Sequence, residues 1–153
     1  MDIQSITKKH LFSSLSGYVH AIAARRSIVA GGIVFYANYL KFFERARTEW
    51  LRSLGVGQQL LREQTGGMFV VTDAQLRYHR PARLDDELIV TAGLQAAGRA
   101  SLTIVQRALL KPEQMTDPST TLLTEGTIRI GWVDAATLRP ARIPSTLLEQ
   151  LTP

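Results

Sequence analysis

A glycine pair, Gly31-Gly32, stands at the start of a run of residues with helical periodicity. The first turn of a helix has backbone N–H groups without intrahelical partners and the positive end of the helix dipole. Such a helix start suits an oxygen atom that gains negative charge during a reaction, and the glycines let a ligand approach the backbone closely. The alternative interpretation is that the pair only forms a turn between a strand and a helix.

No carboxylate that could act as a general base stands close before this glycine pair. Residues 3–43 contain neither Asp nor Glu. Glu44 and Glu49 follow in the helical run, and Asp73 falls in a later strand. Glu44 lies on the polar face, where a solvated salt bridge is the simpler interpretation, whereas Glu49 flanks the apolar face and is the better candidate for a base.

Other catalytic arrangements are missing from the sequence. The absence of cysteine excludes disulfides, thiolate metal sites and a cysteine nucleophile. His10, His20 and His79 do not have the spacing of metal ligands, so we expect neither a metal nor a cofactor. No serine stands in a Gly-x-Ser-x-Gly elbow, which disfavours a serine hydrolase.

The chain is basic, with a net charge of +5 and an isoelectric point near 10.0. A positive field attracts nucleic acid, a membrane surface or an anionic small molecule, or it only keeps the protein in solution. Because no nucleic-acid-binding motif is present, we do not expect a nucleic-acid partner. The arginines that we select for binding phosphate groups are Arg80, at a predicted strand end, and Arg99, at a predicted hairpin turn.

Hydrophobic periodicity predicts one long helix followed by four long strands. Gly55 ends the helix, and a short second helix is expected over Gln58–Gln64. We expect a further strand ahead of the long helix and a last short helix with a capping box between Thr146 and Glu149. The apolar face of the long helix consists of Tyr39, Phe42, Phe43, Ala46, Trp50 and Leu54, and the strands are expected at Met68–His79, Leu88–Ala96, Ser101–Leu110 and Leu122–Val133.

Short connections between these strands imply antiparallel pairing, and the element order implies an α+β fold with the sheet wrapped around the helix. The 153 residues, 45% of them hydrophobic, fit one domain over residues 1–153. No uncharged apolar run reaches the roughly 18 residues of a transmembrane helix. Although Leu11–Ala24 has some features of a secretory signal, serines dilute it, and we expect a cytoplasmic protein.

Four segments resemble one known family: Ala30–Leu40, Phe43–Arg52, Leu76–Leu88 and Gly98–Thr103. They are similar to the 4-hydroxybenzoyl-CoA thioesterase family, in particular to its branch associated with the Tol-Pal system. The resemblance implies a hotdog fold, an antiparallel sheet around one long central helix. It also implies hydrolysis of an acyl-CoA substrate to free acid and CoA at sites between two subunits, and therefore a homodimer or a homotetramer.

The resemblance also implies roles for residues at the helix start. The backbone N–H of Tyr36 is expected to polarise the thioester carbonyl, with Gly31, Gly32 and Asn38 in the same run around the substrate. The family has an Asp two residues before the glycine pair, but this chain has Val29 there.

Three explanations for Val29 remain open. The segment 19–29 is altered relative to a normal enzyme, or the protein binds acyl-CoA or an acyl carrier without hydrolysing it, or another carboxylate has taken over. Glu49 is the first candidate for such a replacement.

Overall fold

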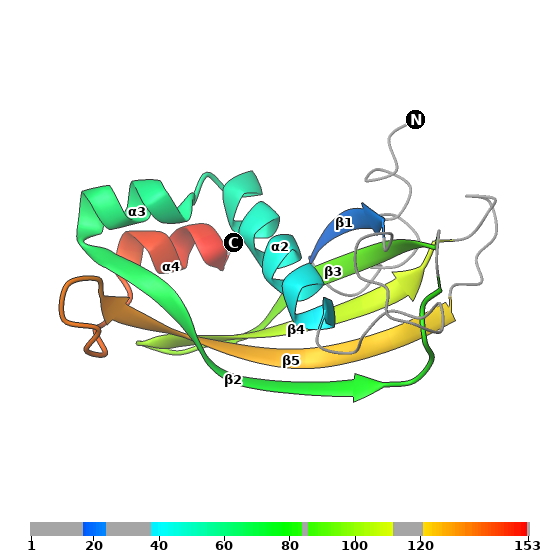
Figure 1. Ribbon diagram of the computed structural model, residues 1–153. Helices are drawn as coiled ribbons and strands as arrows, with labels where there is room; N and C mark the ends of the chain where they lie inside the picture. The colour runs from blue at the N-terminus through cyan, green and yellow to red at the C-terminus, as the bar shows by residue number, and fades with distance from the viewer. Residues whose placement is uncertain (1–16, 24–37, 84–85, 112–120, 153) are drawn as a thin grey trace.

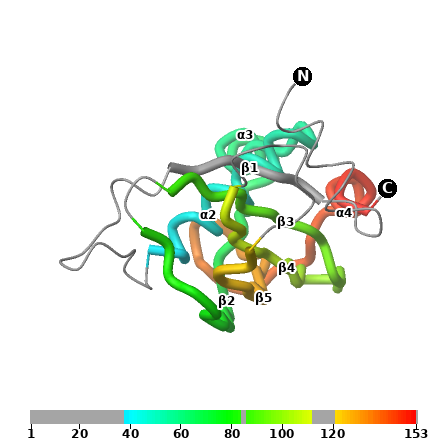
Figure 2. Tube along the Cα trace, turned by 90° about the vertical axis from the view of Figure 1, so that its right-hand side faces the viewer, coloured from blue at the N-terminus to red at the C-terminus, as the bar shows by residue number. Residues whose placement is uncertain are grey.

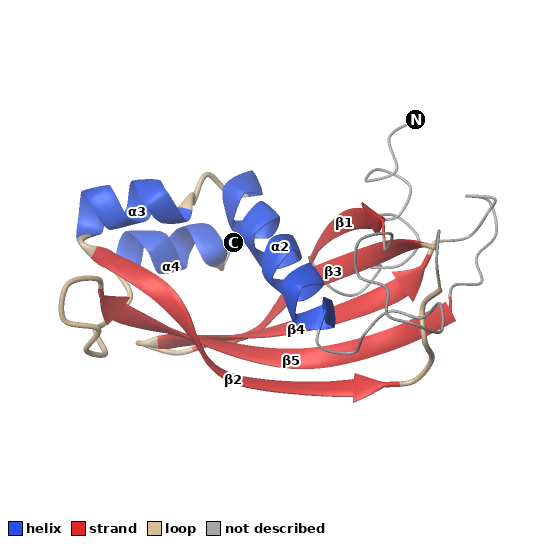
Figure 3. Ribbon diagram, in the orientation of Figure 1, coloured by secondary structure: helices blue, strands red, loops and turns tan. Residues whose placement is uncertain are grey.

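The computed structural model describes residues 17–23, 38–83, 86–111 and 121–152. Within these ranges, five antiparallel strands form one sheet in the order β1-β3-β4-β5-β2, and three helices lie on one face of it (Figures 1 and 3). The predicted α+β arrangement is therefore confirmed. The strands are β1 (Gly17–Ala23), β2 (Gly67–Tyr78), β3 (Glu87–Ala97), β4 (Ser101–Leu110) and β5 (Thr121–Asp134), and the helices are α2 (Asn38–Ser53), α3 (Gln58–Thr65) and α4 (Ser145–Leu151).

Helix α2 is the predicted amphipathic helix, and its apolar face packs on the sheet. Phe43 and Ala46 are completely buried, and Trp50 is nearly so. The helix ends as predicted, because Gly55 adopts a left-handed φ of 79° and the Val56 N–H donates to the Leu51 carbonyl at 2.9 Å. Seen from the side in Figure 2, the strands curve around this helix.

The sheet has long, nearly continuous ladders. β4 pairs with β3 on one side and with β5 on the other, and the predicted hairpin turn at Gly98 is closed by its N–H, which donates to the Ser101 carbonyl at 2.8 Å. β5 also pairs with β2, which is the last strand of the sheet, and a bulge between Val71 and Asp73 interrupts that ladder.

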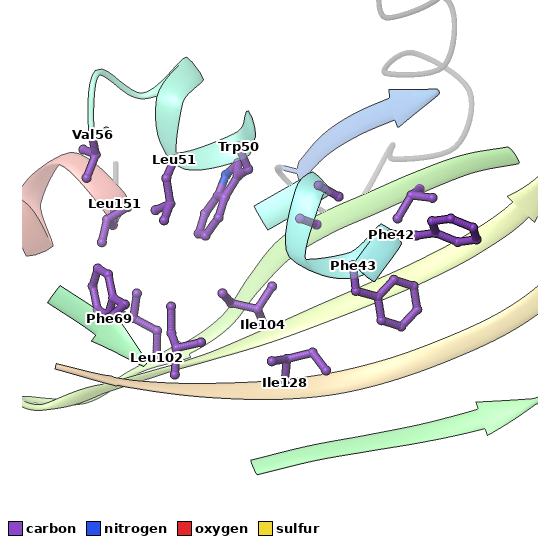
Figure 4. Packing of buried hydrophobic residues seen from close by; sticks show 14 of the residues in the cluster. Phe42, Phe43, Trp50, Leu51, Val56, Phe69, Leu102, Ile104, Ile128 and Leu151 are labelled. Atoms are coloured by element: carbon purple, nitrogen blue, oxygen red, sulfur yellow. The ribbon is translucent and has the colours of Figure 1, made fainter. Parts of the chain in front are cut away.

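Side chains alternate between the two faces of the sheet, so every second residue of a strand points toward the helices. On β4, Leu102, Ile104 and Ala108 are fully buried. Ile128 of β5 lies opposite Ile104 (Figure 4). The same cluster includes Phe69 and Trp132, whose rings meet edge to face at 4.9 Å between centroids. These residues form one core between the helices and the sheet.

The last helix differs in detail from its prediction. It begins at Ser145, after Pro144 as the N-cap, and no side chain caps its start. The expected capping box is therefore wrong, because Thr146 already lies inside the first turn. No helix in the described ranges is long and apolar enough to cross a membrane.

Candidate active site

The start of α2 lies beside the end of β2. The ring of Tyr39 packs against that of Tyr78, with 5.9 Å between the centroids. The first turn of α2 carries no acidic residue, so no nearby side chain of the turn neutralises the positive end of the helix dipole. Asn38, half-buried, is the first residue of the described helix.

Four residues proposed for this site lie outside the described residues: Val29, Gly31, Gly32 and Tyr36. Their roles stay predictions.

Two hydroxyl groups are buried near the helix start. Tyr39 is 2% exposed and Thr124 is fully buried, and neither hydroxyl has a hydrogen-bond partner of good geometry in the described part of the chain. Burial raises the pKa of Tyr39, against smaller opposing effects of Thr124 and of the Ala82 backbone. The Tyr39 hydroxyl therefore stays protonated at neutral pH and is no general base.

A cavity of about 560 Å³ lies between α2 and the strands β2 and β5. Along α2 it runs from Leu40, in the first turn, to Leu51, which is a distance of about 16 Å at 1.5 Å per residue. Apolar side chains from all three elements line it, among them Leu40, Leu51, Phe69, Val71, Ile128 and Ile130. The cavity therefore offers an apolar channel that begins next to the helix start.

A buried polar pair lies at the wall of this cavity. The Arg47 Nη1 donates to Gln106 Oε1 at 2.8 Å, and Gln106 Nε2 donates to the carbonyls of Phe43 at 2.9 Å and of Thr91 at 3.2 Å. Arg47 is 9% exposed and Gln106 is fully buried. Burial lowers the pKa of Arg47 from its usual value, although a guanidinium group stays charged at neutral pH.

The three candidate carboxylates occupy different surroundings. Glu49 is held in an ion pair with Arg52, at 2.6 Å on the exposed face of α2. Glu44 lines the cavity, one turn from Leu40 along the same helix. Asp73 is exposed on β2, opposite Arg129 in the register. The structure thus favours Glu44 over Glu49 as a carboxylate that reaches a bound ligand.

The two selected arginines lie at opposite ends of the sheet. Arg80 follows β2, whose Tyr78 pairs with Thr124 of β5, whereas Arg99 lies in the turn before Ser101, near the far end of β5. In Figure 1 the arrowhead of β2 and the β3–β4 hairpin lie at opposite ends of the sheet. Arg80 is therefore on the side of the helix start, and Arg99 is not brought together with it within one chain.

Sequence reasoning missed Arg47 and Gln106. Each had a signal in the sequence. Arg47 stands four residues after Phe43 and three before Trp50, a spacing that places it on the apolar face of the helix. Gln106 takes one of the core-facing positions in the alternation of β4.

An amphipathic helix crossing a curved antiparallel sheet, with a ligand-sized cavity beside the helix start, defines a hotdog-type binding domain. The sequence profile of the thioesterase superfamily matches residues 31–115. The chain belongs to this superfamily. It is 36% identical to the acyl-CoA thioesterase YbgC of Haemophilus influenzae over 115 residues, which is 75% of this chain and 79% of that protein. It is 34% identical to an acyl-CoA thioester hydrolase YbgC of Escherichia coli over 121 residues, 79% of this chain and 84% of that protein.

Solved structures share the fold. A hypothetical protein from Aquifex aeolicus, 25% identical, aligns with a TM-score of 0.75 over 88% of this chain and 99% of its own. A 4-hydroxybenzoyl-CoA thioesterase variant in complex with 4-hydroxybenzoyl-CoA aligns with a TM-score of 0.80 and is 15% identical. The alignment covers 89% of this chain and 99% of that chain. The predicted hotdog fold and the predicted family are therefore confirmed.

Proposed function

We propose that this protein is an acyl-CoA thioesterase, which hydrolyses a CoA thioester to the free acid and CoA. The observation that carries the proposal is the cavity, which begins in the first turn of α2 and is lined mostly by apolar side chains. A thioester carbonyl at the helix start can then receive hydrogen bonds while its acyl group lies in the cavity. Relatives named as acyl-CoA thioesterases support this assignment.

The residues of the helix start take the following roles in this proposal. The backbone N–H of Tyr36 donates to the carbonyl oxygen as it becomes an oxyanion, and Gly31 and Gly32 allow the thioester to approach the backbone. Arg80, exposed beyond the end of β2, is the better placed of the two selected arginines for a CoA phosphate. Hydrolysis by water uses no metal or other cofactor, and because the proposed substrate is a CoA ester we propose a cytoplasmic location.

The first test restores the carboxylate that the family has at residue 29. We expect Val29→Asp to raise kcat/KM for acyl-CoA hydrolysis by roughly 10²–10⁴-fold, because a positioned general base contributes about that much. Thiol release from short, long and aromatic acyl-CoAs measures it, and the protein adds no thiol of its own because it has no cysteine. Val29→Asn is the matched control, since it adds a polar group of the same size without a base.

A second function has its own support. Because Val29 stands where the family has Asp, a protein that binds acyl-CoA or an acyl carrier without hydrolysing it is the competing proposal. Binding without thiol release, both in the unmodified protein and in the Val29→Asp variant, favours it. Fast turnover by the unmodified protein instead points to another base, and then Glu44→Gln lowers kcat strongly whereas Glu49→Gln does not.

We further propose that one domain spans residues 1–153 and that two copies assemble through β2. β2 is an edge strand of the sheet, so its outer edge has no neighbouring strand in the described chain. Val71 and Tyr78 on this strand are about half exposed, at 52% and 46%. Exposed edges of this length favour pairing with another strand, and a second copy supplies one. The family resemblance also allows a homotetramer of two such dimers.

A further inference from the structure

Arg47 is a buried cation without an ion pair in the part of the chain that the structure describes, and the negative charge that acts on it there is that of the exposed Glu44, one turn earlier on α2. Its one hydrogen bond there goes to the neutral amide of Gln106 at 2.8 Å, and no carboxylate lies at ion-pair distance. A buried charge that is not paired with an opposite charge destabilises a protein, unless a ligand supplies that charge.

The orientation of this guanidinium group is fixed. Gln106 is anchored by two donated hydrogen bonds, one to α2 at the Phe43 carbonyl and one to β3 at the Thr91 carbonyl. Its Oε1 is thereby turned toward Arg47 and accepts a hydrogen bond from Nη1. A guanidinium group has five N–H donors, so the group retains donors for a ligand on its cavity side.

The distance along α2 suits an acyl group that ends near Arg47. From Asn38 to Arg47 the helix rises about 14 Å, and the Arg47 side chain points back toward the helix start. An extended acyl group of about eight to ten carbons covers the remaining length. Apolar side chains line most of this path, as expected for methylene groups, and the cation lies at its far end.

The charges of the cavity wall also favour an anion. Lys41 and Arg47 are its two cations, and Glu44 is its one carboxylate. Lys41 and Glu44 are exposed, so solvent screens both, whereas Arg47 is 9% exposed and keeps most of its effect. The strongest field in the cavity therefore comes from a positive group.

We propose that this cavity selects acyl groups whose far end carries a carboxylate, which pairs with Arg47. The inference rests on the proposed thioesterase function and names its substrate class, the CoA monothioesters of dicarboxylic acids. The terminal carboxylate accepts charge-assisted hydrogen bonds from the guanidinium group, and this contact is absent for a chain that ends in a methyl group.

Binding of two thioether analogues tests the proposal without any hydrolysis. S-decyl-CoA ends in a methyl group, and S-(9-carboxynonyl)-CoA has the same number of chain carbons and ends in a carboxylate. We expect isothermal titration calorimetry to give a dissociation constant at least about tenfold lower for the carboxylate analogue. Because the pair is buried, that ratio should change little between low and high salt. Equal affinities, or tighter binding of the methyl analogue, overturn the proposal.

Variants on one helix locate the effect. Arg47→Met should abolish the preference, and Arg47→Lys should keep a smaller one, because lysine keeps the charge but not the planar fork. Arg45→Met removes an exposed charge two residues away and should keep the full preference. A preference that survives in Arg47→Met, or that disappears in Arg45→Met, contradicts the assignment.

A cavity-filling variant keeps the test decisive if Arg47→Met does not fold. Ala74 is exposed on β2 and lines the same cavity, so Ala74→Phe should weaken binding of both analogues. Unchanged binding of both places the acyl group elsewhere and overturns the inference. Failure of the proposed function has a different signature, namely no thiol release from any acyl-CoA even with Val29→Asp, whatever the two analogues do.

Discussion

At the scale of single residues, Gln106 joins three parts of the protein. Its amide contacts the Arg47 guanidinium group, the Phe43 carbonyl of α2 and the Thr91 carbonyl of β3, and it is fully buried. These bonds fix the height of α2 above the sheet and so the width of the cavity. An apolar residue at this position leaves a buried charge without its partner.

We predict that Gln106→Leu lowers the free energy of unfolding by about 2–4 kcal/mol, because the Arg47 guanidinium group loses its hydrogen bond inside the core. Urea denaturation measures the change. The double variant Arg47→Met/Gln106→Leu should be less destabilised than Gln106→Leu alone, since it removes the uncompensated charge as well. Gln59→Leu, an exposed position on α3, is the control and should change stability by less than about 0.5 kcal/mol. Additive effects of the two buried substitutions contradict this account.

At the scale of elements, the turn after β5 contains local strain. Leu138 adopts a positive φ of 59°, a left-handed conformation that costs a residue with a side chain about 1–2 kcal/mol of conformational energy. The residue is 61% exposed. Asp134 holds the turn in place, because its Oδ1 accepts the N–H groups of Thr137 and Ala136 at 2.9 Å each. These hydrogen bonds, of which that from the Thr137 N–H has the largest effect, lower the pKa of Asp134. The carboxylate therefore stays ionised, and the turn keeps these hydrogen bonds, at a pH below the usual pKa of aspartate.

We predict that Leu138→Gly raises the free energy of unfolding by about 0.5–1 kcal/mol, because glycine adopts a left-handed conformation without the steric cost of a side chain. Leu60→Gly is the matched comparison. Leu60 is similarly exposed, at 49%, but lies in α3, where glycine should destabilise by about 1 kcal/mol. Urea denaturation of both variants should therefore give changes of opposite sign, and a loss of stability in Leu138→Gly contradicts the strain argument.

The elements were more predictable than the site because they follow from local periodicity. The apolar spacing around Phe43 and Trp50 predicted α2, and the alternation after Met68 predicted β2 within one residue at each end. The cavity depends instead on contacts between distant segments, such as Arg47 with Gln106, 59 residues apart. Periodicity also ranked Glu49 above Glu44 as the candidate base. It carries no information about the ion pair of Glu49 with Arg52, or about the cavity that Glu44 lines.

At the scale of the whole molecule, the exposed edge of β2 determines what the protein can assemble with. Asp73, Gln75 and Arg77 alternate on one face of this strand. If a second copy pairs antiparallel about Gln75, each Asp73 lies opposite an Arg77, which stabilises a two-fold symmetric pairing. The same edge borders the cavity through Val71, so the assembly and the substrate site are proposed to share a boundary.

We predict that the protein sediments with twice its 17.0 kDa chain mass at micromolar concentration, and that Val71→Lys raises the dimer dissociation constant by about tenfold or more. A lysine at the paired edge loses hydration when the edge is covered, whereas Leu60→Lys, on exposed α3, should leave the mass unchanged. Analytical ultracentrifugation measures all three proteins. A wild-type monomer at this concentration rules out pairing through β2. A dimer that tolerates Val71→Lys but dissociates with Leu60→Lys moves the interface to α3.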